Sequence, residues 1–143
     1  MATQTVDKLN SFLRGEISAV ETYRQAIEKL SNKPQVGTLN DCMQSHAQRV
    51  GMLRDEIRRR GGEPAQGSGP WGTFAKLVEG GAKALGEKAA IAALEEGEDH
   101  GRDDYKRDAQ DLEPDARQFV EQKLIPEQLR THRALSTLKG QLE

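Results

Sequence analysis

Residues 9–30 read LNSFLRGEISAVETYRQAIEKL, and their inward-facing positions recur in alternating steps of four and three. This spacing predicts one face of a long α-helix that packs against neighbouring helices. The predicted seam consists of Leu9, Leu13, Glu16, Val20, Tyr23, Ile27 and Leu30. Glu16 is its only charged member. The sequence therefore predicts a first helix over about residues 5–31 with a carboxylate in its packing face.

The same spacing predicts three further helices. They are expected over about residues 38–60, 83–112 and 114–142. Pro34 cannot continue the first helix, and Gly61-Gly62 ends the second. Pro114 suits the first turn of the fourth helix, in which Pro126 is expected to cause a kink.

The seams of these helices also contain polar side chains. The second seam is Leu39, Met43, His46, Val50, Leu53 and Ile57. The third contains Ile91, Leu94, Glu98, Tyr105 and Leu112, and the fourth contains Leu124, Gln128, Thr131, Leu135, Leu138 and Leu142.

Residues 61–82 connect the second and third helices. This connection is longer than a helical hairpin needs. It suits a crossover that runs along the bundle and contains a short helical piece, as ferritin-like bundles have. Trp71 and Phe74 give that piece an apolar face, which we expect to plug one end of the core or to contact another subunit.

The composition fits one helical domain over residues 1–143. Hydrophobic residues make up 35% and charged residues 31%, and the net charge is −2. This composition has no excess of basic residues of the kind that nucleic-acid-binding domains have. No stretch approaches the ~20 apolar residues of a membrane span, and no secretory leader is evident, so we expect a cytoplasmic protein. The single cysteine, Cys42, excludes an internal disulfide and is expected to be a buried spectator.

The two halves of the chain resemble each other. Gly15-Glu16 precedes Tyr23 as Gly97-Glu98 precedes Tyr105, and each half then offers a histidine, His46 or His132. With the stretches GSGPWGTF, ALEEGEDHGRDDYKRDAQDL and LIPEQLRTHRALSTL, at residues 67–74, 93–112 and 124–138, the chain resembles a bacterial family of ferritin-like four-helix bundles catalogued as a domain of unknown function. The resemblance implies an all-α fold of two helical hairpins joined by a long crossover. It implies no settled activity.

A carboxylate-bridged two-metal site in such a bundle takes one Glu from each of two helices and a Glu-x-x-His pair from each of the other two. Glu16 and Glu98 fit the single glutamates. However, Met43 stands three residues before His46, and Leu129 stands three before His132. Because neither can bridge hard metal ions, we expect the chain not to be an enzyme, and a di-iron oxidase is the least favoured function.

A reduced metal site remains one interpretation. Glu16, Glu98 and His132 could hold iron or zinc, with His46 and Glu95 as weaker candidates. Counting residues from the expected helix ends places Glu16 about 10 Å further along its helix than the level of His46. The same count places His46 beside Tyr23.

The other interpretation is a polar layer in the core. Buried carboxylates must be paired or protonated, and that requirement alone accounts for polar side chains around Glu16 and Glu98. The residues expected to form this layer are Tyr23, His46, Arg102 and Tyr105.

We therefore expect a non-enzymatic helical bundle that acts through its surface or as a homo-oligomer. The alternative is a metal-binding or metal-storage protein with an incomplete di-iron site. The sequence indicates no nucleic-acid or membrane partner and does not identify a protein partner.

Overall fold

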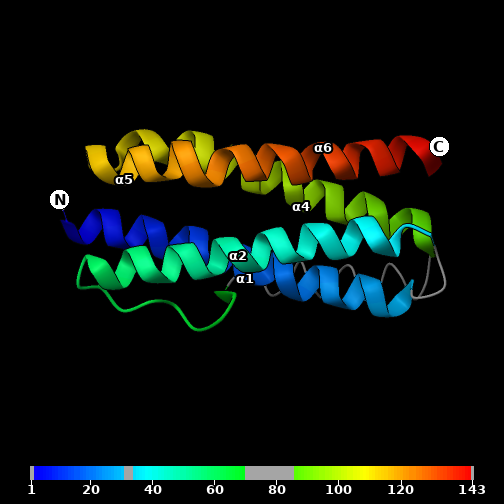
Figure 1. Cartoon of the computed structure of the whole chain (residues 1–143), viewed down its shortest axis with the longest axis horizontal. Helices are drawn as coiled ribbons and strands as arrows, with labels where there is room; N and C mark the ends of the chain where they lie inside the picture. The colour runs from blue at the N-terminus through cyan, green and yellow to red at the C-terminus, as the bar shows by residue number, and fades with distance from the viewer. Residues whose placement is uncertain (1, 31–33, 70–85, 143) are drawn as a thin grey trace.

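The computed structural model describes residues 2–30, 34–69 and 86–142. Within these ranges the chain is an all-α bundle, as predicted, with its long helices side by side along one axis (Figure 1). The first three are α1 (Ala2–Lys29), α2 (Val36–Arg59) and α4 (Glu87–Asp108). A fourth arm follows the 3-10 helix η2 (Ala109–Asp111) and consists of α5 (Pro114–Phe119), the π segment η3 (Val120–Leu124) and α6 (Ile125–Leu142). No helix within the described ranges is long and apolar enough to cross a membrane.

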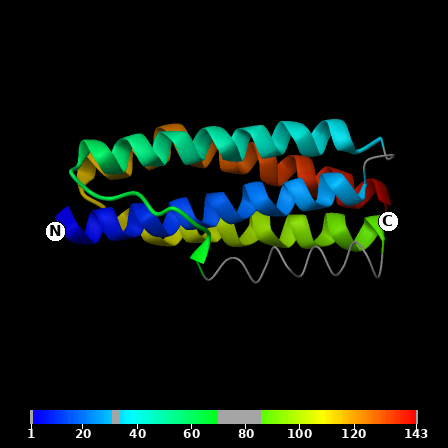
Figure 2. The same cartoon turned by 90° about the horizontal axis from the view of Figure 1, so that it is seen from below.

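The helices form two antiparallel hairpins. α1 packs mainly on α2, and α4 packs mainly on α6. Figures 1 and 2 show that α2 ends at one end of the bundle and that α4 begins at the other. α2 and α4 therefore run in the same direction, and the connection between them joins opposite ends of the bundle.

The helix boundaries lie close to those expected from the sequence. α1 ends at Lys29 and α2 begins at Val36, each two residues earlier than expected. The fourth arm begins at Pro114, as expected. Trp71 and Phe74, with the short helical piece expected around them, lie outside the described residues.

Two apolar clusters fill the core. The first contains Leu9, Phe12, Leu13, Val50, Leu53, Ile57, Tyr105, Ala109, Leu112, Ala116, Val120 and Leu124. The second contains Tyr23, Ala26, Leu30, Leu39, Cys42, Ala90, Ile91, Leu94, Leu135 and Leu138. Burial of a leucine or isoleucine side chain contributes roughly 1.5–3 kcal/mol, so these clusters supply much of the driving force for folding. Cys42 is buried as expected, and burial raises the pKa of its thiol to about 11.

The fourth arm changes its helical pitch before Pro126. Its buried residues advance in steps of four from Ala116 through Val120 and Leu124 to Gln128. Each such step turns about 400° on an ideal α-helix, so the buried face would drift steadily around it. The π segment Val120–Leu124, whose wider turn takes more residues, counteracts this drift. It therefore helps to keep Gln128 facing the interior.

Candidate functional site

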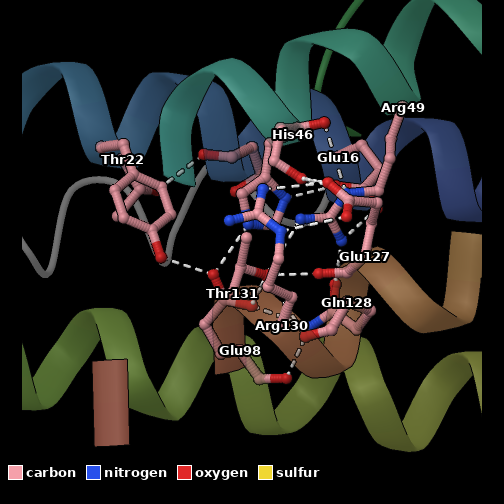
Figure 3. A network of polar contacts seen from close by, with 12 residues as sticks. Glu16, Thr22, His46, Arg49, Glu98, Glu127, Gln128, Arg130 and Thr131 are labelled. Atoms are coloured by element: carbon pink, nitrogen blue, oxygen red, sulfur yellow. Dashed lines mark hydrogen bonds and ion pairs between the residues drawn. The ribbon is translucent and has the colours of Figure 1, made fainter. Parts of the chain in front are cut away.

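A layer of polar side chains separates the two apolar clusters. We call it the polar layer, and it consists of Glu16 from α1, His46 and Arg49 from α2, Glu98 from α4, and Gln128 and Thr131 from α6 (Figure 3). All six residues are buried. Two tyrosines, Tyr23 and Tyr105, point their hydroxyl groups into it from the neighbouring clusters. The layer is thus built from every long arm of the bundle.

Both carboxylate oxygens of Glu98 accept hydrogen bonds. Oε2 accepts from Nε2 of His46 at 2.7 Å and from the Tyr23 hydroxyl. Oε1 accepts from Nε2 of Gln128 at 2.9 Å and from the Thr131 hydroxyl at 2.8 Å. Burial alone would raise the pKa of Glu98, but the charge on His46 and these hydrogen bonds lower it to about 2. Glu98 is therefore ionised at neutral pH although it is buried.

Glu16 is held in a similar way. Its Oε1 lies 2.5 Å from Nδ1 of His46, and its Oε2 accepts from the Tyr105 hydroxyl at 2.5 Å. Nη1 of Arg49 lies 3.3 Å from the same Oε2. Burial would raise the pKa of Glu16, but Arg49 and His46 lower it below its ordinary value.

His46 bridges the two glutamates. Its two ring nitrogens face one carboxylate each, and an ionised carboxylate can only accept hydrogen bonds. Both nitrogens must then donate, which requires the imidazolium form. Burial would lower the pKa of His46, but Glu98 and Glu16 raise it above its ordinary value. The Tyr23 ring lies with its centroid 5.3 Å from that of His46, where its π electrons also favour the cation.

Arg49 is the second cation of the polar layer, and its exposure is 0%. Its Nη1 donates to Oε1 of Gln128 as well as to Glu16, and its Nη2 donates to the Thr131 hydroxyl at 3.0 Å. Its Nε approaches the Ser45 carbonyl oxygen at 3.4 Å. The layer thus contains two carboxylates, one guanidinium and one imidazolium, and its net charge is zero. Pairing of this kind is what permits charged groups to be buried.

The structure brings most of the predicted polar residues together. Tyr23, His46 and Tyr105 surround Glu16 and Glu98, as the interpretation of a polar layer expects. Contact between His46 and Glu16 shows that the separation inferred from helix ends was wrong. α1 ends and α2 begins two residues earlier than expected, so Glu16 and His46 lie at more similar heights along the bundle than the count indicated. Their side chains bridge the remaining distance between the two helices.

Three predicted residues lie elsewhere. His132 is half-buried and pairs with Asp99, and Nη1 of Arg102 lies 3.3 Å from its Nε2. Arg102 also bonds Asp103 and is not among the hydrogen-bond partners of Glu98. Glu95 pairs with Lys139 at 3.1 Å. The structure therefore does not bring His132, Glu95 or Arg102 to the two buried glutamates.

Sequence reasoning missed Arg49 as a member of the layer. It also did not assign Gln128 and Thr131 a role, although both were placed in the seam of the fourth helix. One available signal was spacing, because His46 and Arg49 are three residues apart, and so are Gln128 and Thr131. Two residues at that separation share one face of a helix.

The polar layer does not fit a pair of metal ions as it stands. Within residues 2–30, 34–69 and 86–142, no group of three or more His, Cys, Asp or Glu side chains is arranged to hold a metal. The contacts of His46 with Glu16 and Glu98 are direct hydrogen bonds, and a metal would have to displace their protons. Arg49, a permanent cation, would also repel a metal ion in the same layer.

Gly101 on α4 lies against the side-chain amide of Gln128. A Cβ atom at this position would lie 3.0 Å from Nε2 of Gln128, which donates to the backbone and side-chain oxygens of Glu98. Alanine usually stabilises a helix relative to glycine by up to ~1 kcal/mol. We expect Gly101→Ala instead to destabilise the protein by about 1 kcal/mol in urea denaturation, because the displaced amide loses these bonds.

Gly51→Ala is the matched control for this change. Gly51 lies within α2, and a Cβ atom there would meet nothing within 4 Å. This substitution should stabilise the protein. Equal stabilisation by both substitutions would show that close packing does not hold Gln128 in place.

Comparison with known proteins identifies a family. A family model described as "Domain of unknown function (DUF2383)" matches residues 4–111. No curated protein and no solved structure matches the chain. The matched range includes Glu16, His46, Arg49 and Glu98 and ends before α6, which contributes Gln128 and Thr131 to the layer.

Proposed function

The chain belongs to the DUF2383 family, whose description assigns no activity, so we propose a function from the polar layer. On this proposal the protein is a non-enzymatic, metal-independent bundle of ferritin-like architecture. It acts through its outer surface, alone or as a homo-oligomer. The observation that carries this proposal is the pairing of both buried glutamates with cations of the chain itself. Arg49 and His46 neutralise Glu16 and Glu98, so the layer needs no external ion for charge balance. The side chains best suited to chemistry are therefore engaged in stabilising the fold.

The order of the helices supports the ferritin-like part of this proposal. Ferritin-like bundles place one long crossover between their second and third helices. Here α2 and α4 run in the same direction, and α1 and the α5–α6 arm run opposite to them (Figure 1). A hairpin loop cannot produce that arrangement, but a connection between opposite ends of the bundle can.

A metal-binding or metal-storage role is the second candidate. The observation that favours it is the contact of His46 with both Glu16 and Glu98, which gathers two carboxylates and one imidazole. Iron or zinc could use these ligand types if the His46 protons were released. The set predicted from the sequence, Glu16, Glu98 and His132, would require His132 to leave Asp99.

Elemental analysis separates the two candidates. The protein would be expressed untagged in medium supplemented with iron and zinc and purified without chelator. We expect no stoichiometric metal, and we expect a melting temperature that a chelator leaves unchanged. About one ion per chain would instead support the metal-binding role. Oxygen consumption on addition of ferrous iron would contradict the non-enzymatic assignment.

A further inference from the structure

The polar layer has a distinctive distribution over the helices. Apart from the hydroxyl groups of Tyr23 and Tyr105, which reach it from the neighbouring clusters, α1 and α4 each contribute one residue, whereas α2 and α6 each contribute two residues spaced three apart. The pairs are His46 with Arg49 and Gln128 with Thr131. A dinuclear carboxylate site in a four-helix bundle has the same distribution, with single glutamates on two helices and Glu-x-x-His pairs on the other two.

From this correspondence we propose that the polar layer occupies the six ligand positions of a dinuclear metal site, and that Arg49 and His46 supply the positive charge that metal ions supply in such a site. His46 and Gln128 then stand where the paired glutamates would be. Arg49 and Thr131 stand where the paired histidines would be. Glu16 and Glu98 are glutamates, as the two positions that contribute a single ligand require.

The contacts support this correspondence. In a dinuclear site, carboxylates from different helices share the same cations. In the polar layer His46 lies between Glu16 and Glu98, at 2.5 and 2.7 Å from their oxygens. Arg49 similarly joins Glu16 of α1 to Gln128 and Thr131 of α6. The two cations thus connect all the other members of the layer across the bundle, as Figure 3 shows.

The charges support it as well. Four glutamates and two divalent cations sum to zero, and so do two glutamates, one guanidinium and one imidazolium. In both arrangements the buried layer is neutral, as burial of charge requires. Loss of two carboxylates and gain of two internal cations are therefore compatible with the same surrounding core.

The competing assignment pairs Met43 with His46 and Leu129 with His132. Leu129 is 38% exposed, and Met43 is a half-buried residue packed against the second apolar cluster. His132 faces Asp99 at the edge of the bundle. Of this second set only His46 contacts Glu16 and Glu98, whereas Met43, Leu129 and His132 lie elsewhere. Glutamates placed at positions 43 and 129 would therefore not complete a site.

Introducing glutamates and histidines at each of the two alternative sets of positions tests the proposal. The first variant carries His46→Glu, Arg49→His, Gln128→Glu and Thr131→His. The control variant carries Met43→Glu and Leu129→Glu, which creates Glu-x-x-His spacing in the competing register. Each protein is dialysed against Co²⁺, and metal content, visible absorption and melting temperature are measured.

We expect the first variant to retain about two Co²⁺ ions per chain and to gain a higher melting temperature with the metal. Wild type and the control variant should retain no stoichiometric Co²⁺. A folded first variant that binds no more Co²⁺ than wild type would overturn the proposal, and so would retention of two ions by the control.

A smaller change keeps the test decisive if the four-residue variant does not fold. Arg49→His with Gln128→Glu removes the permanent cation and adds one carboxylate, while His46 and both native glutamates remain. We expect this variant to retain about one Co²⁺ ion per chain. Absence of bound metal in this folded variant would also overturn the proposal.

Discussion

Replacing Arg49 with methionine is expected to destabilise the protein by about 3–5 kcal/mol, the usual cost of removing one partner from a buried ion pair. Methionine fills much of the same volume but leaves the polar layer with one uncompensated negative charge. Oε1 of Gln128 and the Thr131 hydroxyl also lose the donor that Arg49 provides. Urea denaturation at neutral pH measures the change in the free energy of unfolding.

Arg58→Met is the matched control on the same helix. The Arg58 side chain is 63% exposed and lies 3.9 Å from Asp55 in an exposed ion pair. We expect its loss to change stability by no more than about 0.5 kcal/mol. Equal effects of the two substitutions would contradict the role given to Arg49.

A compensating substitution separates the charge from the packing of Arg49. Glu16→Gln removes the carboxylate that Arg49 faces, so the double variant Arg49→Met/Glu16→Gln restores a neutral layer. We expect it to be more stable than Arg49→Met alone, because one buried charge no longer lacks its partner. If the double variant simply loses the sum of the two single effects, the loss in Arg49→Met comes from packing and hydrogen bonds.

The fold could be predicted from the sequence because it depends on a repeated local pattern. The steps of three and four around Leu9, Leu13 and Glu16 mark the buried face of α1, and the other helices repeat them. Such a pattern requires only that apolar residues recur on one side of a helix. Helix ends are less constrained, and the two-residue shifts at Lys29 and Val36 were enough to misplace His46 relative to Glu16.

The candidate site was predictable only in part. Glu16, Glu98 and the two tyrosines interrupt apolar seams, and that local signal identified them. Arg49 gave no such signal, because arginine usually lies at the surface. The adjacent Val50 already supplied the apolar residue expected at that point of the predicted packing face. Its burial depends on partners supplied by α1 and α6, which are far away in sequence.

His132 was assigned to the site for a related reason. The adjacent residue, Thr131, is the one that faces the layer, and His132 lies next to it on the edge of α6. The π segment Val120–Leu124 helps to set which residues of this arm face inward, and the seam alone did not reveal it. Only the three-dimensional structure distinguishes the two neighbouring positions.

Glu98→Ala is expected to have a similarly large effect, about 3–5 kcal/mol at neutral pH, because His46 and Arg49 then face only one carboxylate. Glu96→Ala on the same helix is the control, since the Glu96 side chain is 70% exposed and its Oε1 lies 4.0 Å from Nε2 of His100, which is itself exposed. We expect little change from this control. If Glu98→Ala matches the control in melting temperature and also leaves metal content unchanged, neither a polar layer nor a metal site explains Glu98.

The dependence of stability on pH provides a second and independent measure of what Glu98 contributes to the free energy of unfolding. The pKa of Glu98 is lowered in the folded protein from 4.5 to about 2, so the folded state binds this proton less readily than the unfolded state does. Its stabilising contribution is therefore complete above about pH 4.5 and is lost as the pH falls towards 2, by about 3 kcal/mol in all. Wild type should lose more stability than Glu98→Ala between pH 6 and pH 3, whereas Glu96→Ala should follow wild type. Parallel curves for wild type and Glu98→Ala would show that the buried carboxylate is not held in its ionised form by His46 and its neighbours.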